Sequence, residues 1–209
     1  MTENERLGTQ YHLNEGWLCL DFANTASWHA SSVPVEKLTS YPVLVEWAKG
    51  EGVVSSEEAQ GLLLEATRHP QKAKAALERA IALREALYRI FSALAQDRPT
   101  PPEDLAFLNR VLAETLGGLA VVGGAAGFGW GWRADPRSLD WFLGPIARSA
   151  AELLTTPVRE RVGQCADDRG CGWLFLDLTK NRSRRWCSME SCGNRAKVMQ
   201  HYQRKHRHA

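Results

Sequence analysis

Residues 186–197, WCSMESCGNRAK, hold two cysteines, Cys187 and Cys192, followed closely by an arginine and a lysine. A second pair, Cys165 and Cys171, lies upstream, and fifteen residues separate the two pairs. Structural zinc sites usually take four soft ligands in two such pairs, each on a tight turn that directs both side chains to one point. The four cysteines are therefore predicted to bind one zinc ion.

Other interpretations of this cluster stay open. The spacers hold five and four residues, which is wider than the common two-residue zinc knuckle. The alternatives are reduced core cysteines, a four-thiolate iron site, a thiol switch that expels the metal on oxidation, and a Cys2His2 set that uses His201 and His206. We favour four sulfur ligands, because this choice uses the whole cluster.

The residues between the pairs indicate how the two turns meet. Residues 172–178, GWLFLDL, have the composition of a strand, and residues 179–183 have that of a turn. Residues 184–186 are expected to return along the first strand. A hairpin of this kind carries one cysteine pair to the other. The last 47 residues hold few aliphatic side chains, so this segment needs a metal cross-link to fold.

Length and composition predict a folded protein, because 209 residues with 44% hydrophobic content supply a core. The polar start without a signal sequence predicts a cytoplasmic location, where five cysteines favour metal binding over disulfides. The longest uncharged stretch, residues 116–132, contains seven glycines, so we expect a β-hairpin and no membrane span. Cys19 is expected to pack in the core.

The N-terminal three quarters of the chain show mostly helical patterns. Residues 16–26, GWLCLDFANTA, are the exception and predict a short strand that ends in a turn. SSEE at 55–58 and TPPE at 100–103 resemble capping boxes that start helices. Apolar residues three and four apart predict a core helix over 71–96 and another over 138–154, which a proline kinks or starts.

Cations concentrate near the C-terminus. Residues 163–209 hold ten Lys and Arg against four acids, a net charge of +6, whereas the preceding 162 residues have a net charge of −4. A zinc ion bound by four thiolates adds −2, so the basic segment still carries +4. This asymmetry favours an acidic body with a basic segment that binds an anionic partner.

The run after Cys192 predicts a helix with Asn194 as its N-cap and Val198, Met199 and Tyr202 facing inward. Arg195 in its first turn either neutralises the thiolates or contacts the partner. Phosphates reward clustered cations, because each neutralised phosphate releases counterions. The residues expected to contact DNA are Lys180, Arg182, Arg184, Arg185, Arg195, Lys197, Arg204 and Lys205.

Three motifs, CGWLFLD, RRWCSM and CGNR followed by AK, resemble the CGNR zinc finger of bacterial proteins over about residues 163–206. LDFANT at residues 20–25 resembles, more diffusely, the ABATE domain that precedes this finger, over about residues 10–155. The resemblance implies a DNA-binding, stress-induced transcription regulator. By position it makes the metal ligands Cys165, Cys171, Cys187 and Cys192.

Asp21, Asn24 and Arg84 are the candidate ligand-binding residues of the larger domain. Arg84 lies on the apolar stripe of the long helix, where a cation is costly unless a carboxylate pairs with it, and we expect Asp21 to be that partner. Such a pair is either structural or the polar end of an effector pocket. Asn24 or Thr25 could equally cap the next helix, which we favour.

Together these features predict an α+β protein: a mostly helical domain with a small antiparallel sheet over 1–157, and a zinc-bound hairpin and helix module over 158–209. We expect a DNA-binding transcription regulator, not an enzyme, whose larger domain senses a small molecule or forms a homodimer. The alternatives are a zinc-stapled protein-interaction module or an enzyme with a pocket at Asp21, Asn24 and Arg84. No membrane partner is expected.

Overall fold

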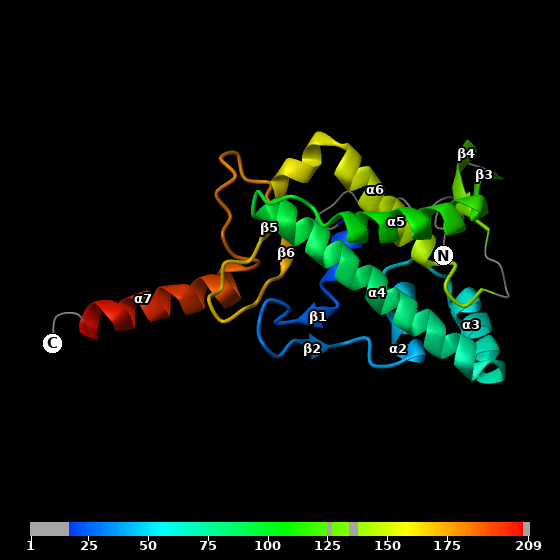
Figure 1. The fold of residues 1–209 in the computed structure, drawn as a ribbon, viewed down its shortest axis with the longest axis horizontal. Helices are drawn as coiled ribbons and strands as arrows, with labels where there is room; N and C mark the ends of the chain where they lie inside the picture. The colour runs from blue at the N-terminus through cyan, green and yellow to red at the C-terminus, as the bar shows by residue number, and fades with distance from the viewer. Residues whose placement is uncertain (1–16, 125–126, 134–137, 207–209) are drawn as a thin grey trace.

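The computed structural model describes residues 17–124, 127–133 and 138–206, with the backbone alone at 200, 201 and 203–206 (Figure 1). The long helix α4 (Pro70–Ala95) runs through the body, and the other body helices surround it. The C-terminal segment forms one end of the molecule, from which α7 (Asn194–His206) projects. The fold is α+β, mostly helical with small antiparallel two-stranded sheets, as predicted.

The first described element is a helix, α1 (Leu18–Ala23), where the sequence predicted a strand. The Asp21 N–H donates to the Trp17 carbonyl at 3.1 Å, and Cys19 and Phe22 are fully buried. A short apolar run buried on both faces shows neither a helical nor a strand period, so composition alone could not decide. Cys19 lies in the core, as expected.

A small sheet and two helices follow α1. They are β1 (Ala26–Ser27), which pairs antiparallel with β2 (Val35–Glu36), then α2 (Tyr41–Gly50) and α3 (Ser56–Arg68). The capping box of α3 is confirmed, because Ser55 Oγ accepts from the Glu58 N–H at 3.1 Å and the Glu58 carboxylate accepts from the Ser55 N–H at 2.7 Å.

The predicted core helix is α4, and its inward face is buried as the spacing indicated. Helix α5 (Pro102–Thr115) follows, with proline at its first position. Its N-cap is Pro101, without a side-chain cap, so the capping box expected from Thr100 is wrong. The fully buried residues of α4 are Ala80, Leu83, Leu87, Ile90 and Phe91.

The glycine-rich segment forms the expected hairpin, β3 (Leu119–Gly124) and β4 (Gly127–Trp132), after a short 3-10 turn η2 (Leu116–Gly118). Helix α6 (Leu143–Thr155) then begins two residues before Pro145, so this proline marks the helix start. A Cβ at Gly144 would lie 2.3 Å from the Trp132 ring, so glycine allows α6 to approach β4 closely.

The C-terminal segment corrects the predicted hairpin. It contains η3 (Pro157–Arg161), β5 (Val162–Gln164), β6 (Leu174–Leu176), the π-helical turn η4 (Met189–Gly193) and α7. Strand β6 pairs with β5, not with residues 184–186. The buried Asp177 carboxylate accepts from the Arg184 N–H at 2.8 Å, so the backbone after β6 turns around this carboxylate and forms no return strand.

The body and the C-terminal segment share one core. Val162 of β5 and Leu174 of β6 belong to the same buried cluster as α1, α4 and α6. Among the described helices, none combines the length and apolar character that a bilayer span requires.

Candidate metal centre

The four predicted ligands converge on one point. The Sγ atoms of Cys165, Cys171, Cys187 and Cys192 all lie within 4.8 Å of one another. Cys187 Sγ is 3.8 Å from Cys171 Sγ and 3.6 Å from Cys192 Sγ. Tetrahedral zinc with Zn–S bonds of about 2.3 Å requires sulfurs about 3.8 Å apart. The cluster therefore fits zinc in both donor type and spacing.

The first knuckle, residues 165–171, is the connection of the β5–β6 hairpin. The Cys165 N–H donates to the Trp173 carbonyl at 2.9 Å, which fixes the backbone at the first ligand. Gly170 and Gly172 flank the second ligand, Cys171, with φ of +86° and +65°. This left-handed backbone favours glycine and turns the chain sharply around the sulfur.

The second knuckle, residues 187–192, is held by its own hydrogen bonds. Ser188 Oγ accepts from the Glu190 N–H at 3.1 Å and caps the turn η4. Asn194 has helical backbone angles and is the first residue of α7, so the prediction that it is the N-cap of this helix is wrong. The Gly193 N–H donates to the Ser188 carbonyl at 2.9 Å. A backbone bond joins the first knuckle to the segment just before the second, from the Ala166 N–H to the Arg185 carbonyl at 2.9 Å.

Burial sets the electrostatics of the sulfurs. Burial raises the pKa of the Cys187 thiol and raises that of Cys192 to about 11. Burial acts in the same direction on Cys165, but hydrogen bonds from the backbone N–H groups of Cys187 and Asp167 outweigh it and lower the pKa. A divalent cation stabilises all four as thiolates, so the site suits a metal better than free thiols.

Arg195 is part of the metal centre. Its Nη2 lies 2.8 Å from Cys192 Sγ and 3.1 Å from the Asp167 carboxylate, which is 3% exposed. Asp167 also accepts from Arg169 Nε at 3.3 Å. Burial acts to raise the pKa of Asp167, but Arg169 and Arg195 outweigh it and hold the pKa at about 2. Of the two roles considered for Arg195, the structure shows the contact with the sulfur.

The other predicted DNA-binding cations differ in what holds their side chains. Arg184 is built into the fold, because it donates to the Trp186 carbonyl at 3.1 Å and lies 4.4 Å from the Phe175 ring centre. The side chains of Arg204 and Lys205 lie outside the described residues. The exposed cations are Lys180, Arg182, Arg184, Arg185 and Lys197, of which Arg184 is the one held by the contacts just described.

Helix α7 presents an apolar group to solvent. Val198, Met199 and Tyr202 are 56%, 47% and 59% exposed, so the prediction that they face inward is wrong. The helix projects from the body, and in the described part of the chain no core covers these side chains (Figure 1). Helical periodicity identified a common face but could not show whether a partner within the chain lies against it.

The candidate ligand-binding residues of the larger domain, Asn24 and Arg84 among them, contact different parts of the structure. Asn24 does not cap a following helix: its Nδ2 donates to the Leu174 carbonyl and its Oδ1 accepts from the Leu174 N–H, both at 2.9 Å. Thr25 Oγ1 donates back to the Phe22 carbonyl at 2.7 Å. Asn24 therefore connects the N-terminal domain to β6.

Arg84 is buried, as its position on the apolar stripe required, but its partner is not Asp21. It donates to Glu36 at 2.7 Å and to Glu85 at 2.8 Å. Asp21 is separate from this network: burial and the nearby Glu51 raise its pKa to about 6. The pairing could not be predicted because Glu36 is on β2 and reaches Arg84 through tertiary folding.

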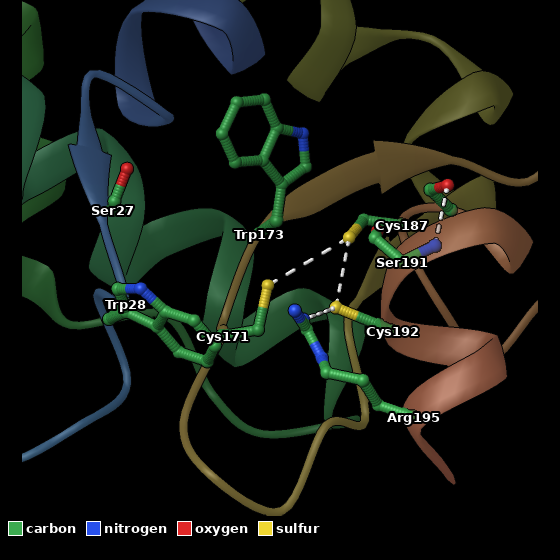
Figure 2. A pocket seen from close by; sticks show the side chains of 9 residues that line it. Ser27, Trp28, Cys171, Trp173, Cys187, Ser191, Cys192 and Arg195 are labelled. Atoms are coloured by element: carbon green, nitrogen blue, oxygen red, sulfur yellow. Dashed lines mark hydrogen bonds between the residues drawn. The ribbon is translucent and has the colours of Figure 1, made fainter. Parts of the chain in front are cut away.

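An open hollow of about 410 Å³ lies between the N-terminal domain and the metal cluster (Figure 2). Figure 2 shows Cys171, Cys187 and Cys192 directed toward one another, with Trp28 and Arg195 beside them. Sequence reasoning missed Trp28 and Asp167 because neither carries a motif; the one available signal was the position of Asp167 between two ligands. The lining residues are Ser27, Trp28, Cys171, Trp173, Cys187, Ser188, Ser191, Cys192 and Arg195.

Comparison with known families agrees with this architecture. The family model ABATE, described as "Putative stress-induced transcription regulator", matches residues 16–157. The CGNR zinc finger model matches residues 161–205 and so includes all four cysteines. A search of curated proteins found no match.

Proposed function

Because the chain belongs to the ABATE family and carries a CGNR zinc finger, we propose that it is a transcription regulator whose finger binds DNA. Bound zinc supplies the cross-link that joins the two knuckles. The chain's own residues supply the surface for the nucleic acid. The N-terminal domain has the regulatory role in this proposal, because it packs directly on the finger.

The observation that carries the proposal is the set of exposed cations around the metal centre. Lys180, Arg182 and Arg185 lie in the loop after β6, at the same end of the molecule as α7 (Figure 1). Only Arg182 has an acidic partner in the described part of the chain, Glu160 at 3.1 Å, and both side chains of that pair are half exposed. Exposed pairs are weak, so all three cations are available to phosphates.

Helix α7 is the element proposed to enter a groove. Lys197 and the exposed Val198, Met199 and Tyr202 cover one part of a helix that projects from the body. A DNA major groove accommodates an α-helix, and apolar side chains there contact thymine methyl groups. The loop cations then position the protein on the backbone, and α7 reads base edges.

The test is binding of the zinc-loaded protein to a random-sequence duplex, measured by fluorescence anisotropy at low and moderate salt. With three phosphate contacts, raising salt fourfold is expected to weaken binding by about 40-fold. The triple charge reversal Lys180→Glu, Arg182→Glu and Arg185→Glu is expected to flatten this salt dependence. Lys72→Glu is the matched control, because Lys72 is an exposed cation at the start of α4 in the other domain.

A protein-contact module is the second candidate, and the exposed apolar group of α7 favours it. Such a surface also suits an apolar groove on a protein partner. The salt experiment separates the two functions. Absence of measurable DNA binding at low salt contradicts the proposal and leaves the protein-contact function, whereas steep salt dependence supports DNA.

A further inference from the structure

We infer that the N-terminal domain holds the first knuckle in its metal-binding geometry and thereby determines how firmly the finger retains zinc. The inference deepens the proposed function, because it supplies a physical route from the regulatory domain to the finger. It rests on four sets of contacts across the seam between residues 24–31, α4 and the first knuckle. Its test needs no DNA.

The first contact is the Asn24 amide on β6. Both polar atoms of this side chain bond to the backbone of Leu174 at 2.9 Å, so the amide occupies the strand edge that faces away from β5. Asn24 is 4% exposed, which makes both bonds costly to lose. The residue before Leu174 is Trp173, whose carbonyl accepts from the Cys165 N–H. One further hydrogen bond therefore connects the start of β6 to the first ligand.

The second contact brings two backbones together at the glycines of the knuckle. A Cβ at Gly170 would lie 2.6 Å from the backbone N and Cα of Ser31. A Cβ at Gly172 would lie 2.7 Å from the Ala30 N and 2.4 Å from the Tyr88 hydroxyl. Both glycines adjoin Cys171, so the loop of the N-terminal domain lies directly against the turn that carries this ligand.

The third contact is Trp28, which lies near two arginines of the finger. The guanidinium carbons of Arg169 and Arg195 lie 5.3 Å and 5.2 Å from its ring centre. Asp167 pairs with both arginines, and Arg195 contacts Cys192 Sγ. Trp28 has a φ of +56°, a strained backbone that persists only where surrounding contacts hold it. The N-terminal domain thus also reaches the second knuckle.

The fourth contact fixes the residue that precedes Cys165. Gln164 donates from Nε2 to the Tyr88 hydroxyl at 2.7 Å and accepts from Ser92 Oγ at 3.0 Å. Tyr88 and Ser92 are one turn apart on α4, the central helix of the body. The larger domain therefore holds the residue that immediately precedes the first ligand, Cys165, in the chain.

These contacts are expected to change zinc affinity because metal binding and knuckle geometry are linked. A ligand set that is already ordered loses less conformational entropy when it takes up metal. Interactions that favour the ordered knuckle raise zinc affinity by the same factor by which zinc strengthens them. A displacement of residues 24–31 is therefore expected to change the zinc affinity of the metal site.

The test compares two glycine substitutions in the full zinc-loaded chain, with zinc transfer to a chromophoric chelator as the measurement. Gly170→Ala forces a Cβ into Ser31, whereas Gly52→Ala places one at φ +70° with nothing within 4 Å. Both substitutions place a Cβ on a left-handed backbone and are strained for that reason, but only Gly170→Ala disturbs the seam. We expect Gly170→Ala to lose zinc about 10- to 100-fold faster and Gly52→Ala to match the unmodified protein.

Asn24→Ala is the second arm, with Asn181→Ala as its control because Asn181 is an exposed amide within the finger. Faster zinc loss is expected for Asn24→Ala alone, at unchanged far-UV circular dichroism. If Asn24→Ala fails to fold, the glycine pair decides by itself. Equal zinc loss from the two glycine variants overturns the inference. If the protein binds no DNA but the two glycine variants lose zinc at different rates, the proposed function is refuted and the inference is supported.

Discussion

The two knuckles of the metal centre differ in what holds them. The second knuckle is local, because its capping serine and its closing backbone bond both come from residues 188–193. The first knuckle depends on residues far away in the sequence, since Asn24 lies 150 positions before Leu174. A motif in the sequence can thus identify all four ligands while showing only half of what positions them.

Zinc removal is expected to produce the largest difference between the two knuckles. Structural zinc contributes on the order of 10 kcal/mol to the folding of small modules. After chelation, the Gly193 and Glu190 amides of the second knuckle are expected to lose hydrogen-exchange protection. The Leu174 and Cys165 amides are expected to stay protected, because Asn24 and the β5–β6 hairpin still hold them.

Hydrogen exchange with mass spectrometry measures both knuckles in one experiment, and the zinc-loaded protein is the control. Cys187→Ser in place of chelation should reproduce the pattern. Loss of protection at Leu174 together with Gly193 would show that the metal, and not the N-terminal domain, orders both turns.

A substitution in the segment that joins the knuckles is expected to have a medium effect on the free energy of unfolding. Asp177 accepts from the Thr179 N–H at 2.8 Å, the Thr179 hydroxyl at 2.6 Å and the Arg184 N–H at 2.8 Å. Asp177→Ala removes the buried acceptor of all three bonds and is expected to cost about 2 kcal/mol. Denaturant unfolding of the zinc-loaded protein measures this cost. Asp168→Ala, at an exposed carboxylate nearby, is the control and should change little.

The smallest effect is expected within the second knuckle. Ser188→Ala removes the cap of η4 and should destabilise the finger by about 1 kcal/mol, with faster zinc loss. Ser191→Ala changes an exposed serine of the same turn and serves as the control. An effect of Ser188→Ala larger than that of Gly170→Ala on zinc loss would reverse the ranking of external and local support.

The sequence predicted the features that depend on short spacing. The ligand set, the core helix α4, the capping box at Ser55 and the glycine-rich hairpin each follow from residues close together in the chain. Periodicity and capping chemistry are local, so they survive without knowledge of the tertiary fold.

Apart from the local errors at α1, Thr100 and Asn194, the errors concern partners that only folding brings together. Glu36 pairs with Arg84 from another element, and β5 replaces residues 184–186 as the neighbour of β6. The α7 side chains have the right spacing for an inward face, yet they are exposed because the helix projects. Composition specifies what a side chain prefers, whereas topology decides whether that preference is met.

Cys19 differs from the other four thiols because it lies in the main core, apart from the metal cluster. Burial raises its pKa to about 12 and leaves it without solvent access, so it stays protonated and unreactive at neutral pH. A maleimide added to metal-stripped but folded protein is therefore expected to react with cysteines of the knuckles first, and with Cys19 only once α1 opens. The order in which the cysteines are alkylated, followed by peptide mass, therefore reports the opening of the core separately from the metal site.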